Sequence, residues 1–185
     1  MTTLNRRPLL IAYYPDFGRF FSFRKQSKLD EVAESLGMDY LFPTGGWFRA
    51  WRDRDLRGQP SFELADFDMM ARGRKVVLAG YSDGAGLANY LASYRSEQVI
   101  AVVSYAGRLQ RDSIETSHKF PVLDLWNEKD DRCCSAQHLH MQAMYEGQQH
   151  ELKPEVIFNK RGHYRGWDSD ANGSVVDFLR PAIAA

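Results

Sequence analysis

The strongest constraint on the fold of this chain is a set of short segments that are apolar on both faces. Residues 9–12 read LLIA, residues 76–79 read VVLA and residues 99–103 read VIAVV. A strand without polar alternation is buried on both sides, as in a parallel sheet covered by helices. Strand-like apolar runs predict six strands, at residues 8–14, 38–42, 75–81, 99–105, 121–126 and 155–159.

Helical patterns fill the intervals between these runs. The clearest is an apolar stripe at i, i+3, i+4 and i+7 that runs from Leu87 to Tyr94. Other helices are predicted between Ser27 as N-cap and Gly37, over 62–72, over 136–144, and from 175 to a stop near Pro181. Alternating strands and helices predict an α/β fold: a doubly wound, mainly parallel sheet of about six strands with helices on both faces. At 185 residues, we expect a single domain.

The charge balance argues against two classes of partner. Lys and Arg together number 24, as do Asp and Glu, so the formal net charge is zero. A neutral chain has no global field to hold a polyanion or an anionic membrane, so we expect no nucleic-acid and no membrane partner. The apolar run at residues 9–14 is too short to span a bilayer or to form a signal-peptide core. The expected location is cytoplasmic.

The cysteines add to this expectation. Cys133 and Cys134 are the only two, and they are adjacent. Neighbours in sequence cannot form a long-range cross-link, which fits a reducing compartment. No Cys or His cluster with ligand spacing surrounds them, so we expect no metal and no cofactor.

Residues 80–84 contain the motif that most directly indicates a chemical function. They read GYSDG, which matches the pattern G-x-S-x-G, and they lie between a predicted apolar strand and a predicted amphipathic helix. A nucleophile elbow needs this context, because its serine sits on a sharp strand-to-helix turn. The alternative is an ordinary Gly-rich turn that holds phosphate, but the spacing matches neither G-x-G-x-x-G nor a P-loop. The pattern predicts Ser82 as a nucleophile.

The stretch 76–88, VVLAGYSDGAGLA, resembles the elbows of α/β-hydrolases. It is similar to the small esterases of the dienelactone-hydrolase, carboxylesterase/thioesterase and polyhydroxyalkanoate-depolymerase-like groups, and the resemblance covers nearly the whole chain. It implies a minimal α/β-hydrolase fold without a lid domain. It also implies a catalytic acid after the second strand beyond the elbow, and a histidine after the strand that follows.

Only His163 follows the last predicted strand, so the resemblance implies His163 as the base. His118 precedes a strand, His138 and His140 fall in the predicted helix 136–144, and His150 lies between that helix and the last strand. Such positions face away from the carboxyl edge of the sheet, where ligands bind in open α/β folds.

The acid is expected in the segment WNEKDD, residues 126–131. Asn127 stands where many relatives have the glycine of a His-Gly pair, and the acid lies three residues later, which matches Asp130. This chain lacks His-Gly, so the register of the loop is open, and Asp131, Asp124 and Glu128 remain alternatives.

These groups imply an acyl-serine mechanism. Neutral imidazole takes the serine proton near pH 7, and the carboxylate orients the imidazole. The oxyanion needs two donors. One is expected to be the backbone N–H of Asp83; the other is assigned to Tyr14, with Asp16 or a tyrosine hydroxyl as alternatives, because Pro15 has no N–H.

The substrate is expected to be a small, uncharged carboxylic ester. Only residues 106–120 separate two strands where many relatives insert a lid, which favours an open site. Aromatic side chains near the site are expected to bind the substrate, namely Trp47, Trp126 and Tyr164, with Trp167 as a further candidate. A thioesterase or peptidase with the same triad, or an inactive ligand-binding module of this fold, remains an alternative.

Overall fold

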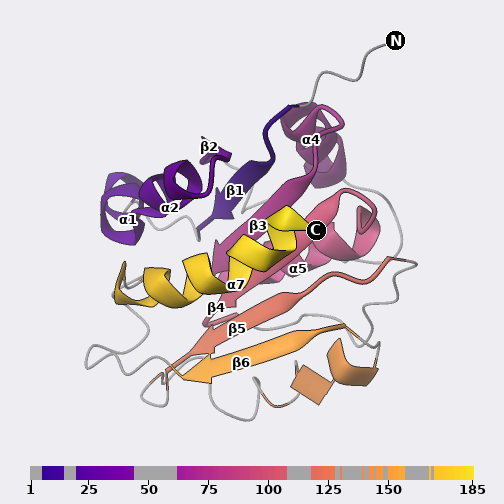
Figure 1. The fold of residues 1–185 in the computed structure, drawn as a ribbon. Helices are drawn as coiled ribbons and strands as arrows, with labels where there is room; N and C mark the ends of the chain where they lie inside the picture. The colour runs from indigo at the N-terminus through magenta and orange to yellow at the C-terminus, as the bar shows by residue number, and fades with distance from the viewer. Residues whose placement is uncertain are drawn as a thin grey trace.

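The computed structural model describes residues 6–14, 20–43, 62–107, 118–127, 130, 139, 142–143, 145–147, 150–156, 167 and 169–185. Its centre is a six-stranded sheet of order β2-β1-β3-β4-β5-β6, in which every neighbouring pair is parallel (Figure 1). The strands are β1 (Leu9–Tyr13), β2 (Asp39–Leu41), β3 (Val76–Tyr81), β4 (Val99–Tyr105), β5 (Val122–Trp126) and β6 (Leu152–Val156).

Helices cover both faces of this sheet, so the predicted doubly wound α/β architecture is confirmed. The described helices are α1 (Phe20–Ser27), α2 (Leu29–Ser35), α4 (Phe62–Ala71), α5 (Asp83–Tyr94) and α7 (Asn172–Ala184), with a 3-10 turn η2 (Ser169–Ala171) before the last. One core cluster joins the sheet to residues of α1, α2 and α7. A second core cluster joins the opposite face to α4, α5 and Tyr145.

The apolar runs form strands because both of their faces are covered. All five residues of β1 and all six of β3 are buried. Leu10 and Val77 belong to one core cluster, whereas Leu9 and Val76 belong to the other. Successive side chains of a strand point to opposite faces, so a strand buried on both sides carries apolar residues at every position.

Three predicted details are wrong. Ser27 does not cap α2: it is the buried last residue of α1, and Lys28, in the left-handed region at φ 49°, precedes α2 instead. The helix α1 escaped prediction, and its Phe23 fills the core. The last helix does not stop near Pro181 but continues to Ala184, since the missing N–H costs only one bond within its final turns. Strand β6 begins at Leu152 rather than at residue 155, because an edge strand tolerates Pro154.

A buried polar network lies between the sheet and the helices on the α5 face. Ser104 and Asp124 are neighbours on β4 and β5, and both are fully buried. Gln142 Nε2 donates to Asp124 Oδ2 at 3.2 Å, and the Tyr145 hydroxyl donates to Asn89 Oδ1. Burial, with Asp124 nearby, raises the pKa of Tyr145. The network fixes Gln142 and Tyr145, which the structure describes as helical, against β5 and α5, since a buried polar group needs a partner.

Within the described residues, no helix combines the length and apolarity that crossing a bilayer would require.

Candidate active site

Ser82 occupies a sharp turn between β3 and α5. Its backbone lies at φ 54° and ψ −123°, a region that is costly for a residue with a Cβ. Hydrogen bonds hold this turn on both sides: Ser82 N donates to Tyr105 O at 2.9 Å, and Ser82 O accepts from Ala85 N at 3.0 Å. The strand, the strained serine and the helix that follows are the arrangement of a nucleophile elbow.

The two glycines of the motif allow the first turn of α5 to pack closely on the sheet. A Cβ at Gly80 would overlap the carbonyl group of Gly84. A Cβ at Gly84 would overlap the carbonyl group of Tyr13 and would lie 2.8 Å from Tyr14 N. The G-x-S-x-G spacing is therefore required by contact between backbones and not only by the turn itself.

This contact brings the end of β1 to the beginning of α5. Tyr14 N lies beside Gly84, two residues after Ser82, and α5 begins at Asp83. The N-terminal end of a helix carries free N–H groups and a partial positive charge, which favour an anion. The two expected oxyanion donors, Asp83 and Tyr14, thus come from segments that meet beside Ser82.

The same place is the topological switch point of the sheet. From β1 the chain passes to β2 on one side, and it later returns to β3 on the other side of β1. The carboxyl ends of β1 and β3 therefore carry Tyr14 and Ser82 next to each other. Ligands of open α/β sheets bind at this kind of crevice.

Of the acid candidates, the structure describes Asp130 and Asp124. Asp130 is only 6% exposed and follows the carboxyl end of β5, and its backbone N donates to Asn127 O at 2.9 Å. Asp124 lies within β5, fully buried, and accepts the hydrogen bond from Gln142. Asp124 thus belongs to the network on the α5 face, whereas Asp130 lies on the same edge of the sheet as Ser82. Asp131 and Glu128 lie outside the described residues.

The expected base, His163, also lies outside the described residues, as do His138 and His140. The two described histidines precede strands, at the opposite edge of the sheet from Ser82. His118 is exposed before β5. His150 is buried before β6, with its ring against Phe120 and Tyr145 and its Nδ1 3.2 Å from Phe120 O. Neither is placed to act on Ser82.

The aromatic residues expected around the substrate have different outcomes. Trp126 is partly exposed at the end of β5, near Asp130 in the sequence. Trp167 is only 2% exposed and packs in the core, so it does not form a wall of an open pocket. Trp47 and Tyr164 lie outside the described residues.

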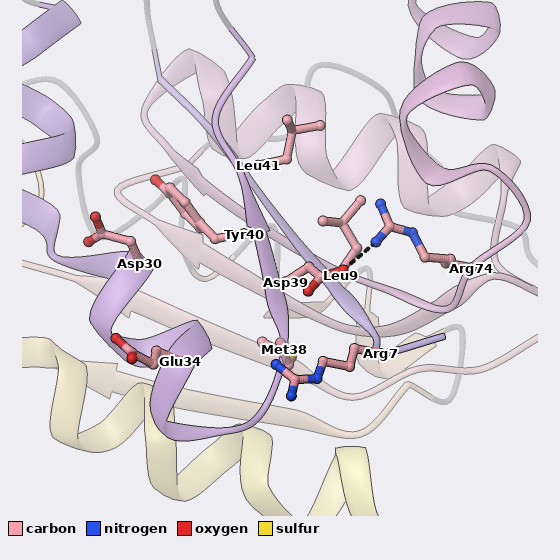
Figure 2. Close-up of a pocket in the computed structure, with 9 residues that line it drawn as sticks. All are labelled: Arg7, Leu9, Asp30, Glu34, Met38, Asp39, Tyr40, Leu41 and Arg74. Carbon is pink, nitrogen blue, oxygen red and sulfur yellow. Dashed lines mark hydrogen bonds and ion pairs between the residues drawn. The ribbon is translucent and has the colours of Figure 1, made fainter. Parts of the chain in front are cut away.

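A pocket of about 530 Å³ lies at the amino end of β1 and β2, away from Ser82 (Figure 2). Its wall includes an ion pair in which Arg74 Nη1 lies 2.7 Å from Asp39 Oδ2. Burial raises the pKa of Tyr40, which also lines the pocket. The pocket is at the wrong edge of the sheet to hold a substrate of Ser82.

Metal ligation has no geometric support in the part of the chain that the structure describes, where no three His, Cys, Asp or Glu side chains are grouped as a cation would require.

The sequence does not predict a group of packed aromatic side chains at the carboxyl ends of β1, β3 and β4. Tyr14 stacks on Phe23 and on Tyr81, and Tyr81 packs edge-on against Tyr105. No local pattern of the sequence indicates this group, because its members come from separate segments that meet only in the fold.

No protein-family model and no curated protein sequence matches this chain. Solved structures do resemble it. A predicted CIB-like hydrolase from Thermoplasma acidophilum superposes with a TM-score of 0.75 at 16% identity, over 98% of this chain and 90% of that one. Esterase PE8 gives a TM-score of 0.71 at 18% identity, over 96% and 93%. The Bacillus cereus carboxylesterase gives 0.65 at 16% identity, over 95% and 89%. These likenesses show the fold, and the α/β-hydrolase fold that the sequence predicts is confirmed.

Proposed function

Because the chain has the α/β-hydrolase fold with a strained serine at its elbow, we propose that it is a serine hydrolase that cleaves small carboxylic esters. The backbone of Ser82, at φ 54° between β3 and α5, is the observation that carries the proposal. Strain of this kind persists where the surrounding structure enforces it, and it is concentrated at functional sites. The esterases and hydrolases among the structural neighbours support the same reaction class.

In this proposal Ser82 attacks the ester carbonyl while His163 takes its proton. The alcohol leaves with that proton, and a water activated by His163 then hydrolyses the acyl-serine. Asp130 holds the imidazole in the required tautomer, and its burial keeps the interaction away from competing water. The backbone N–H groups of Asp83 and Tyr14 stabilise the oxyanion.

The proposed substrate is uncharged and small, and Trp47, Trp126 and Tyr164 are the proposed contacts for its apolar parts. The mechanism needs no metal or other cofactor. The proposed location is cytoplasmic, to which the adjacent cysteines are suited. The zero net charge supports the proposal that the protein has no nucleic-acid or membrane partner.

Labelling with a fluorophosphonate probe tests the proposal, because only an activated serine reacts with it. The wild-type chain should be labelled, and Ser82→Ala should abolish labelling and lower ester turnover by on the order of 10⁴-fold or more. Ser93→Ala is the matched control. Ser93 lies on the same helix α5, and its hydroxyl donates a hydrogen bond to Tyr90 O. Equal labelling of Ser82→Ala, or no labelling of the wild type, would refute the proposal.

A panel of nitrophenyl esters and thioesters of increasing acyl length would then rank the possible substrates. Turnover of thioesters or peptides far above that of esters would move the chain to another hydrolase class with the same triad.

A further inference from the structure

Five aromatic rings form a closed circuit at the carboxyl edge of the sheet, and we call them the five-ring cluster. Neighbouring rings lie at centroid separations of 4.3 to 6.4 Å. In order around the circuit they are Tyr14, Phe23, Trp167, Tyr105 and Tyr81.

The rings come from five separate segments, and most are deeply buried. Tyr14 follows β1, Phe23 lies in α1, Tyr81 and Tyr105 end β3 and β4, and Trp167 precedes η2. Phe23, Tyr105 and Trp167 are each at most 2% exposed, and Tyr81 is 4% exposed. The three edge-to-face contacts of the circuit are those of Trp167 with Phe23 and Tyr105, and that of Tyr81 with Tyr105. Such contacts fix the mutual orientation of rings as well as filling volume.

Three of these segments adjoin parts of the proposed machinery. Tyr81 directly precedes Ser82, and Tyr105 O accepts the hydrogen bond from Ser82 N at 2.9 Å. Tyr14 is the proposed second oxyanion donor. Trp167 packs edge-on against Tyr105, so it supports the residue whose carbonyl group holds the Ser82 backbone.

Trp167 also carries a hydrogen-bond tether from its side chain. Its indole Nε1–H donates to Asn172 Oδ1 at 2.9 Å. Asn172 Nδ2 in turn donates to Ser27 O at 2.7 Å. The asparagine thereby ties Trp167 to the beginning of α7 and to the end of α1. An aliphatic side chain could fill the same volume in the core. The hydrogen bond to Asn172, however, requires a side chain with an N–H donor, such as the indole of Trp167.

We propose that Trp167 is a positioning residue, which, with the tether through Asn172, holds the five-ring cluster and thereby fixes the strand ends that carry Ser82 and Tyr14. The inference rests on the proposed function, and it goes beyond it by assigning a role to a buried side chain that touches no substrate. Displacing a catalytic group by about 1 Å lowers turnover by on the order of 10²-fold, even when the altered residue is far from the chemistry.

The test compares three variants by probe labelling, by kcat and KM for a soluble short-chain ester, and by thermal unfolding. Trp167→Leu removes both the ring and the tether, and Trp167→Phe keeps a ring but loses the tether. Phe67→Leu is the control: Phe67 is fully buried in the core on the opposite face of the sheet. Trp167→Leu should lower kcat and the labelling rate by on the order of 10²-fold with KM little changed. Trp167→Phe should show a smaller loss, because it keeps the ring but not the tether, whereas Phe67→Leu should lower the melting temperature without a comparable change in kcat.

Asn172→Ala provides a second route if Trp167→Leu fails to fold. It leaves the ring in place and removes the tether, so kcat should fall further than in Phe67→Leu at a comparable loss of melting temperature, with KM little changed. Loss of activity in proportion to loss of stability in all variants, or wild-type labelling of Trp167→Leu and Asn172→Ala, would overturn the positioning role alone. An unlabelled wild type would overturn the proposed function, and this inference with it.

Discussion

After Ser82, Asp130 is the proposed catalytic residue whose surroundings the structure describes in most detail. It is buried at the edge of the sheet that carries Ser82, and the turn from Asn127 holds its backbone. The adjacent Asp131 has the same charge, and two successive residues of a loop cannot readily aim their side chains at one histidine. The pair therefore gives a natural comparison.

We expect Asp130→Asn to lower kcat by roughly 10⁴-fold, because the amide leaves the imidazole in the wrong tautomer. Asp131→Asn should change kcat by well under tenfold, since it alters a neighbouring charge only. Both variants are measured at the same pH, so that the wild type and the variants are compared under identical conditions. If Asp131→Asn is the inactive variant, the catalytic acid is Asp131 and the proposed assignment is off by one residue. If both variants stay active, the acid lies on another segment.

At the scale of elements, the close approach of α5 to β1 makes Gly84 intolerant of any side chain. A Cβ there overlaps the Tyr13 carbonyl, so Gly84→Ala should displace the first turn of α5, destabilise the fold and abolish probe labelling. Gly173→Ala in α7 is the control, because nothing lies within 4 Å of its Cβ position. It should be neutral or stabilising by up to about 1 kcal/mol. Thermal unfolding and labelling measure both, and a stable, labelled Gly84→Ala would contradict the described packing.

The ion pair between α4 and α5 predicts a dependence of stability on pH. Arg95 donates to both oxygens of Asp68 at 2.7 Å, and these hydrogen bonds hold the pKa of the Asp68 carboxyl below its ordinary value. A carboxyl whose pKa is lowered by folding stabilises the protein above its unfolded-state pKa, about 4. That contribution is lost as the pH falls through the lower folded-state value.

Asp68→Asn should therefore lower the free energy of unfolding at neutral pH by less than about 1 kcal/mol, because the pair is largely exposed. The difference from the wild type should vanish in acid well below pH 4. Denaturant unfolding across this range measures it, with the exposed Asp177→Asn on α7 as the comparison variant. A constant difference at every pH would mean that the pair does not act through charge.

The sequence predicts what local patterns encode. Strands buried on both faces are recognisable because every position is apolar, and the elbow is recognisable because Gly80, Ser82 and Gly84 fall between an apolar strand and an amphipathic helix. Helix α1 is not predicted because its apolar residues show no clear stripe. Ser27 resembles an N-cap in the sequence, although it is the last residue of α1. The five-ring cluster could not be predicted, since Phe23 and Trp167 meet only through the tertiary fold. The triad with His163 stays a prediction.

For the molecule as a whole, the short connection between β4 and β5 favours a site without a moving cover. Soluble short-chain esters should follow ordinary saturation kinetics, with no jump in rate when the substrate passes its solubility limit. Initial rates measured across that limit, with Ser82→Ala as the background, provide the check. A sharp rise at the interface would reveal a cover, for which the segment 45–58 is the first candidate.

The all-parallel sheet also determines how this chain must reach its native state. Neighbouring parallel strands cannot be joined by a tight turn. Each pair of neighbouring strands in the sheet therefore forms only after a long crossover segment has brought the two strands together. The chain loses conformational entropy when each loop closes, before the strand hydrogen bonds and contacts form. Folding is therefore slower than in chains rich in local contacts. Until the helices cover them, apolar strands such as β3 stay exposed to other copies of the chain. The yield of folded protein should therefore fall steeply with the concentration at which refolding begins, even though the finished sheet buries those same strands completely.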